Sequence, residues 1–214
     1  MSELRTDALI KALAADVAAP VRMSLRRALV LAMIPAAVVS FALLLMSAGI
    51  RPDIAAAFVA GVVPFKLAVT LTLTVSAFLL AQRVSRPDND PQILYYALPP
   101  ALLVGAGILF EVFATRSGVD TRSLGNTPLA CVSLVLLFSL PPLVAAFAVM
   151  RRGAARSPAM AGAAAGLFAA GVGASVYALH CPNDDAIYVG IWYGLAVAIA
   201  AGVGSLLGRK LLNW

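Results

Sequence analysis

Six long apolar runs constrain this chain of 214 residues more than any other feature of the sequence. Each run is long enough to cross ~30 Å of hydrocarbon as a helix, which takes about 20 residues. A backbone in lipid must satisfy its own hydrogen bonds, and a barrel would show alternating apolar and polar positions, so continuous runs predict helices. The sequence therefore predicts an all-α polytopic membrane protein with six transmembrane helices in one bundle. The runs lie at 28–49, 57–81, 93–114, 128–150, 159–179 and 187–207.

The composition supports this class, because 62% of the residues are hydrophobic and 12% are charged. Charged residues make up about a quarter of ordinary soluble domains. A segment of 27 residues precedes the first run, and no clear small-residue cleavage site closes the run, so we expect an uncleaved first span. We divide the chain into a soluble N-terminal segment at 1–27, the span bundle at 28–207 and a tail at 208–214.

The basic residues are distributed unevenly among the loops, which predicts the orientation of the chain. Twelve of the 16 Lys and Arg residues lie in the N-terminal segment, the second and fourth loops and the C-terminus, and three lie in the other loops. The basic residues behind the net charge of +6 are therefore spread over several segments and form no single patch. This distribution gives no reason to expect nucleic-acid binding. We expect both termini in the cytoplasm.

An amphipathic helix is expected in the N-terminal segment, with Thr6 as its N-cap and Pro20 as its stop. The segment is too short to bury a core of its own, so its apolar stripe needs either the membrane surface or a groove on a partner protein. Acidic residues among the basic ones weaken attraction to anionic lipid and favour the partner protein. The stripe consists of Leu9, Ile10, Leu13 and Val17, and the acidic residues beside it include Asp7 and Asp16.

Most of the chemically unusual residues are expected at the outer ends of the spans. The six residues from His180 to Asp185 hold the only His, one of the two Cys and two carboxylates. Lys66 lies near the outer end of the second span, where it either snorkels to the interface or pairs with a carboxylate, and we expect Glu111 as its counter-ion. The expected outer cluster consists of Lys66, Glu111, Cys131, His180, Cys181, Asp184 and Asp185.

The sequence leaves three readings of Cys131 and Cys181 open. In an oxidising bacterial periplasm two thiols within reach tend to form a disulfide, which is then either a structural bond or part of a redox switch. The third reading is a transient zinc or cadmium ion bound by both thiolates and His180. His-Cys-Pro is not a usual metal spacing, so thiol chemistry is favoured and no permanent cofactor is expected.

Three classes of function compete for such a chain. A thiol/disulfide or quinone oxidoreductase should show a Cys-x-x-Cys pair on its working loops, but the two cysteines lie 50 positions apart. A small-solute or metal transporter should carry polar residues at mid-bilayer, where this chain has only Ser and Thr hydroxyls. A sensor that is not an enzyme needs reactive outer groups and a free inner helix, and the sequence supplies both.

The sequence resembles the NrsF family of six-span bacterial membrane proteins over essentially its whole length. The resemblance rests on the stretch from Thr6 to Asp16, on Arg51-Pro52-Asp53, on Lys66, on Cys131 and on His180-Cys181-Pro182. It implies an anti-sigma factor of the inner membrane, which binds an extracytoplasmic-function sigma factor through the N-terminal segment. It also implies that the two cysteines take part in sensing oxidative or metal stress.

Overall fold

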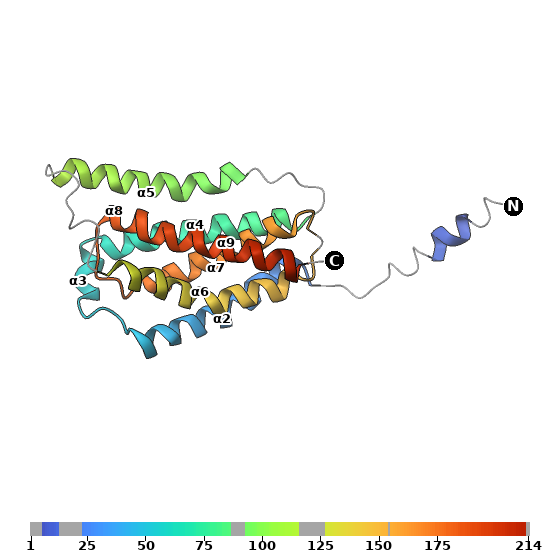
Figure 1. Ribbon diagram of the computed structural model, residues 1–214, viewed down its shortest axis with the longest axis horizontal. Helices are drawn as coiled ribbons and strands as arrows, with labels where there is room; N and C mark the ends of the chain where they lie inside the picture. The colour runs from blue at the N-terminus through green and yellow to red at the C-terminus, as the bar shows by residue number, and fades with distance from the viewer. Residues whose placement is uncertain (1–5, 13–22, 87–92, 116–126, 154, 213–214) are drawn as a thin grey trace.

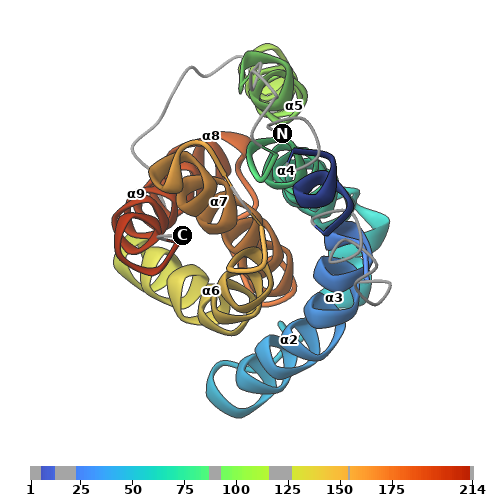
Figure 2. The same cartoon turned by 90° about the vertical axis from the view of Figure 1, so that its right-hand side faces the viewer.

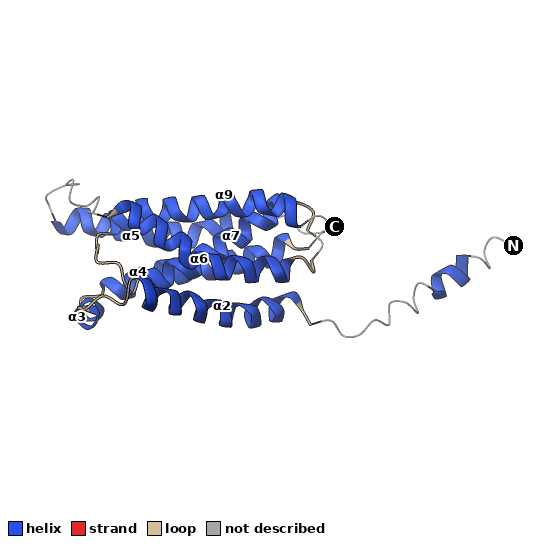
Figure 3. Cartoon of the chain, turned by 60° about the horizontal axis from the view of Figure 1, so that its bottom comes forward, coloured by secondary structure: helices blue, strands red, loops and turns tan. Residues whose placement is uncertain are grey.

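The computed structural model describes residues 6–12, 23–86, 93–115, 127–153 and 155–212. All the regular structure within these residues is helical (Figure 3), and six stretches are long and apolar enough to cross a membrane, which confirms the predicted fold class. A short helix at 6–12 precedes them. The elements that follow are α2 (Leu25–Ser47), α3 (Ile54–Val59), α4 (Val62–Val84), α5 (Ile93–Thr115), α6 (Pro128–Met150), α7 (Pro158–Tyr177), α8 (Ala186–Tyr188), the π-helix η2 (Val189–Tyr193) and α9 (Gly194–Leu211).

Side-chain caps and prolines set where several of these helices begin. The Ser24 hydroxyl accepts a hydrogen bond from the Arg27 N–H at 3.4 Å at the start of α2, and Ser157 does the same for Met160 at the start of α7. The first turns of α6 and α7 each contain a proline, where an N–H would have no helical partner. Both helices therefore begin within one residue of the predicted spans.

The second span begins later than the sequence predicted. α3 ends at Val59 and α4 begins at Val62, so the predicted run 57–81 is broken near its start. Gly61 takes a φ of 80° between the two helices, a left-handed conformation that glycine adopts without steric cost. Hydropathy does not register this break, because the residues on both sides of the glycine are apolar.

The last span begins at Ala186 and is not a continuous α-helix. α8 passes into η2 before α9 starts at Gly194. Such wide π-helical turns are rare and frequently lie at functional sites. Here η2 contributes Val189 and Tyr193 to the hydrophobic cluster that also contains both cysteines.

Helix α7, which corresponds to the fifth predicted span, lies at the centre of the bundle. It packs against α4, α6 and α9 (Figure 2), and 67% of its apolar window is buried, whereas none of the apolar window of α5 is. Small residues explain the close approach of α7 and α9. A Cβ atom added to Gly166 would meet the backbone of Ala200 in α9.

The bundle has two different ends, which lie at the left and the right of Figure 1. We call the end that holds the α2–α3 turn, the start of α4 and the start of the last span the thiol end. The opposite end holds the start of α2 and the end of α9 (Figure 1), and we call it the termini end. The six spans thus bring the start of α2 and the end of α9 to the same end of the bundle.

Replacing Gly166 by leucine should destabilise the bundle, because the α7 and α9 backbones would have to separate. Overpacking of this kind costs typically about 1–3 kcal/mol, and a backbone neighbour cannot move aside as a flexible side chain does. Gly202→Leu is the matched control, since a Cβ at Gly202 meets nothing within 4 Å. Thermal unfolding of both variants in detergent measures the difference, and equal melting temperatures would contradict the close packing.

Candidate functional site

Four charged side chains meet at the thiol end, and we call them the charge clamp: Arg51, Asp53, Lys66 and Asp184. Lys66 Nζ lies 2.8 Å from Asp184 Oδ1, and Arg51 Nη1 lies 2.7 Å from the same oxygen. Arg51 Nη2 also lies 2.7 Å from Asp53 Oδ2. Lys66 is fully buried and Arg51 is 7% exposed, so both cations depend on these carboxylates.

The charge clamp also holds the backbone of residues 178–185, which connect α7 to α8 and which we call the cysteine segment. The Cys181 carbonyl accepts hydrogen bonds from Lys66 Nζ at 3.0 Å and from Arg51 Nη1 at 3.1 Å. The position of Cys181 is therefore fixed by the same two cations that Asp184 neutralises. The sequence predicted Lys66 and Asp184 as members of an outer cluster but did not predict Arg51 as one. The feature that could have identified Arg51 is its position close to Asp53 in a short outer turn.

The expected Lys66–Glu111 pair is wrong, because Asp184 is the carboxylate that lies on Lys66. Glu111 Oε2 instead accepts hydrogen bonds from the N–H groups of Ala186 at 2.6 Å and Ile187 at 3.2 Å. The first N–H groups of a helix have no partner within the helix, and a carboxylate there also complements the helix dipole. Glu111 therefore attaches α5 to the start of the last span.

Hydrogen bonds determine the charge states of the clamp residues that lie outside the spans. Burial alone would raise the pKa of Asp184, but hydrogen bonds from Arg51 and Lys66 outweigh it and hold that pKa below its usual value. The hydrogen bond from Arg51 likewise lowers the pKa of Asp53, and the bonds to Asp53 and Asp184 raise the pKa of Arg51. All three groups are therefore charged at neutral pH.

Both cysteines are buried free thiols, and they lie in one hydrophobic cluster at the thiol end. Three tyrosines belong to the same cluster, and two of their rings, Tyr177 and Tyr193, have centroids 5.6 Å apart. The Tyr193 hydroxyl is buried and has no hydrogen-bond partner among the described residues. We call the five side chains the thiol core: Cys131, Cys181, Tyr177, Tyr188 and Tyr193. The structure thus brings together the two cysteines that the sequence placed at one end.

His180 attaches the cysteine segment to the end of α2. Its Nδ1 lies 2.9 Å from the Gly49 carbonyl, and because a carbonyl only accepts, this nitrogen carries the proton. The sequence predicted His180 as a neighbour of the thiol and not as a contact to α2. Among the described residues, no group of three or more His, Cys, Asp or Glu side chains is arranged to hold a metal ion, so the zinc or cadmium site expected at Cys131, His180 and Cys181 has no preformed ligand set.

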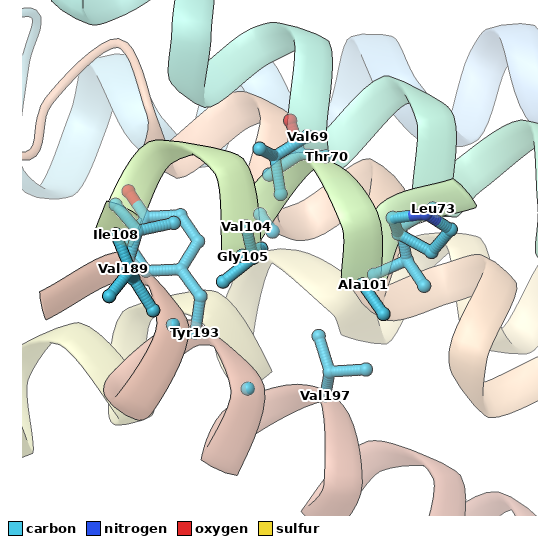
Figure 4. A pocket seen from close by; sticks show the side chains of 14 residues that line it. Val69, Thr70, Leu73, Ala101, Val104, Gly105, Ile108, Val189, Tyr193 and Val197 are labelled. Atoms are coloured by element: carbon cyan, nitrogen blue, oxygen red, sulfur yellow. The ribbon is translucent and has the colours of Figure 1, made fainter. Parts of the chain in front are cut away.

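An apolar cavity of about 420 Å³ lies beside the thiol core, between α4, α5 and the last span (Figure 4). Val189 and Tyr193 line it and also belong to the cluster that contains the cysteines. The Thr70 hydroxyl on its wall already donates to the Lys66 carbonyl at 3.0 Å. Among the described residues that line this cavity none is an Asp, Glu, Lys, Arg or His, so the lining is predominantly apolar.

The described part of the N-terminal segment is helical at 6–12, as the sequence predicted. Leu9 and Ile10 are 60% and 57% exposed, so this half of the apolar stripe is open to a partner, and Asp7 beside it is exposed as well. The remaining predicted docking residues and the predicted stop lie outside the described residues: Leu13, Asp16, Val17 and Pro20.

The fold and the site define a six-span membrane protein. Its two cysteines lie at the thiol end, and an exposed helix at 6–12 precedes α2, which starts at the termini end. The family model described as negative regulator of sigma F, NrsF, matches residues 13–214. The chain belongs to the NrsF family, which confirms the resemblance seen in the sequence. Membership in this anti-sigma factor family implies a regulatory rather than a catalytic role and a sigma factor as partner.

Two relatives align with the chain over nearly its whole length. It is 30% identical to the anti-sigma-F factor NrsF of Caulobacter vibrioides (strain NA1000 / CB15N) over 216 residues, which cover 99% of this chain and 100% of the relative. It is 31% identical to the probable anti-sigma-F factor NrsF of Azospira oryzae (strain ATCC BAA-33 / DSM 13638 / PS) over 213 residues, which cover 99% of this chain and 100% of that protein. No solved structure matches the chain.

Asp184→Asn should destabilise the protein, because it removes the carboxylate that neutralises the buried Lys66. Breaking a buried ion pair costs about 3–5 kcal/mol, and the exposure of Asp184 reduces this toward about 2 kcal/mol. Asp185→Asn is the matched control, since Asp185 lies outside the clamp and makes no side-chain cap hydrogen bond. Chemical denaturation in detergent measures both variants.

The same experiment has a predicted pH dependence. The pKa of Asp184 is lower in the folded protein than the usual value of an aspartate, 3.8. Its stabilising effect is therefore fully present above pH 3.8 and is lost as the pH falls through the folded-state pKa. The difference in the free energy of unfolding between wild type and Asp184→Asn should therefore shrink as the pH falls through the folded-state pKa. A difference that stays constant at acidic pH would exclude the charge clamp as its cause.

Proposed function

We propose that this protein is an inner-membrane anti-sigma factor that binds an extracytoplasmic-function sigma factor through its N-terminal segment and releases it when its periplasmic thiols are modified. The observation that supports the proposal most is the exposed apolar stripe at Leu9 and Ile10, in a segment that precedes the first span of an NrsF-family chain. The relatives' names specify sigma F as their target. We carry only the class of partner over to this chain.

The distribution of basic residues supports an orientation with the termini end in the cytoplasm. The N-terminal segment then meets the cytosolic sigma factor, and the thiol end faces the oxidising periplasm. This orientation separates output from input by the full thickness of the membrane. The membrane lipid around the six spans is the only other partner that the proposal requires.

The apolar stripe is proposed to occupy a groove on the sigma factor. Leu9 and Ile10 would be buried there, and Leu13 and Val17 would extend the same face by two further turns of a helix. Asp7 and Asp16 would lie at the edge of the contact, where acidic groups complement basic residues of the partner. Burying each apolar side chain contributes about 1.5–3 kcal/mol.

The thiol core is proposed to receive the signal. A peroxide that oxidises Cys131 and Cys181 takes two electrons and two protons, so that one S–S bond forms while the peroxide O–O bond breaks to give an alcohol and water. Buried thiols in apolar surroundings are inert, so the cysteine segment must open before the reaction. Transient capture of a zinc or cadmium ion by the two thiolates and His180 is the second route that we propose.

The new bond is proposed to change how α6 and α7 pack, because Cys131 lies in α6 and Cys181 follows α7. Packed interfaces adopt discrete arrangements, so a small change at one end is transmitted to the other. A shift of about 1.4 kcal/mol between two packings changes the sigma-bound equilibrium tenfold. The S–S bond would shift this equilibrium by the difference in its free energy between the two packings.

Polar substitution of the stripe should release the sigma factor while the protein stays in the membrane. The variant Leu9→Ser, Leu13→Ser, Val17→Ser removes three apolar anchors, and Lys11→Ser, off the stripe, is the control. Co-purification of the sigma factor with each full-length variant from membranes measures the effect. Retention of the sigma factor at the wild-type level by the triple variant would show that this face is not the docking surface.

The two cysteines should act as one unit in signalling. Cys131→Ser and Cys181→Ser should each change the signalling response to a similar degree. The double variant should show no larger change than either single variant, because the effects of substituting two residues that act through one bond do not add. Reporter output from the sigma factor's promoter, with membrane abundance measured in parallel, separates a lost signal from lost protein. Additive effects of the two substitutions would point to independent roles.

A further inference from the structure

We infer that Arg51 is the positioning residue that couples the cysteine segment to α2, and that α2 transmits the thiol signal to the N-terminal segment. The inference deepens the proposed sensing function and rests on it for the nature of the output. It assigns a route across the membrane that starts at the Cys181 carbonyl and ends at the start of α2. Three sets of contacts support it.

The backbone of the α2–α3 turn is attached directly to the cysteine segment. The Arg51 N–H donates to the Leu179 carbonyl at 3.1 Å, and the Gly49 carbonyl accepts from His180 Nδ1 at 2.9 Å. Gly49 itself takes a φ of 71° and donates to the Leu44 carbonyl in the last turn of α2 at 2.7 Å. The turn is therefore fixed to α2 on one side and to the segment after α7 on the other.

The Arg51 guanidinium uses every donor it has. A guanidinium carries five N–H groups in a rigid fork. Nε and Nη2 donate to Asp53 at 2.8 and 2.7 Å, Nη1 and Nη2 donate to Asp184 at 2.7 and 3.1 Å, and the remaining Nη1 donor reaches the Cys181 carbonyl at 3.1 Å. A displacement of Cys181 or Asp184 therefore breaks bonds of a cation that is almost fully buried, unless Arg51 moves with them.

Helix α2 also contacts the element that carries the other cysteine. The Ser40 hydroxyl in α2 donates to the Phe138 carbonyl of α6 at 2.7 Å. Phe138 belongs to the same hydrophobic cluster as Cys131 and Cys181. α2 is thus attached to both cysteine-bearing parts of the thiol end, and its 23 residues span about 35 Å to the termini end.

Lys66 shares two of these partners but cannot perform the same role. It donates to the Cys181 carbonyl at 3.0 Å and to Asp184 at 2.8 Å, but it belongs to α4, which does not lead into the N-terminal segment. α2 is the span that follows that segment directly. Lys66 therefore stabilises the cysteine segment, while Arg51 connects it to the output.

The coupling is tested with Arg51→Lys, which keeps the charge and loses the five-donor fork. Arg151→Lys, at an exposed position of the termini end, is the matched control. Diamide oxidises the thiols in each protein, taking two electrons and two protons as its N=N bond becomes N–N and one S–S bond forms. Hydrogen exchange of α2 peptides and the Kd for the sigma factor are measured before and after oxidation.

Oxidation should change exchange at the start of α2 by about threefold or more in wild type and Arg151→Lys, and should leave it nearly unchanged in Arg51→Lys. The Kd should change about tenfold in the first two proteins and not in the third. An unchanged α2 in the oxidised wild type, or an equal response in Arg51→Lys, would overturn the coupling role. A change in α2 exchange without a change in Kd would instead refute the sensing function and leave the coupling intact.

If Arg51→Lys does not yield folded protein, Asp53→Asn tests the same claim from the exposed side of the clamp. It weakens two of the five guanidinium bonds while the ion pair between Arg51 and Asp184 remains. The α2 response to oxidation should then fall below that of wild type. A full wild-type response in Asp53→Asn would overturn the role of Arg51.

Discussion

The burial of two cations at the thiol end is the constraint on which the rest of the site depends. An unpaired Lys66 or Arg51 in apolar surroundings would be costly, so Asp184 and the Cys181 carbonyl must lie where both cations reach them. This requirement holds the segment between α7 and the last span across the end of the bundle. It thereby places Cys181 in the thiol core.

The same arrangement determines how the thiols are protected. Cys131 and Cys181 are both fully buried, and the segment that covers them is held by the charge clamp, by His180 on Gly49 and by the backbone bond from Arg51. Because both thiols are fully buried, we expect a reagent to reach them only after several of these interactions open together. In the proposed function this cooperativity gives the sensor a threshold, because small fluctuations of single bonds do not expose the thiols.

The sequence predicts the spans well because hydropathy and length are local properties, and it predicts one reactive end because alternate span ends lie on the same side. It does not identify the partner of Lys66, since Glu111 and Asp184 both lie at that end and only three-dimensional packing distinguishes them. The break at Gly61 and the π-helix at Val189–Tyr193 lie within apolar stretches that have no polar signal. Arg51 was missed as a member of the site because the two partners that place it there, Cys181 and Asp184, are 130 and 133 positions away in the chain.

The central claim, that modification of periplasmic thiols releases a sigma factor held at the cytoplasmic face, is tested most directly in spheroplasts. A membrane-impermeant thiol oxidant is added outside, and the fraction of sigma factor that sediments with the membrane is measured over time. The account predicts that this fraction falls in wild type and stays constant in the double Cys→Ser variant. A sigma factor that stays membrane-bound while both thiols become oxidised would contradict it.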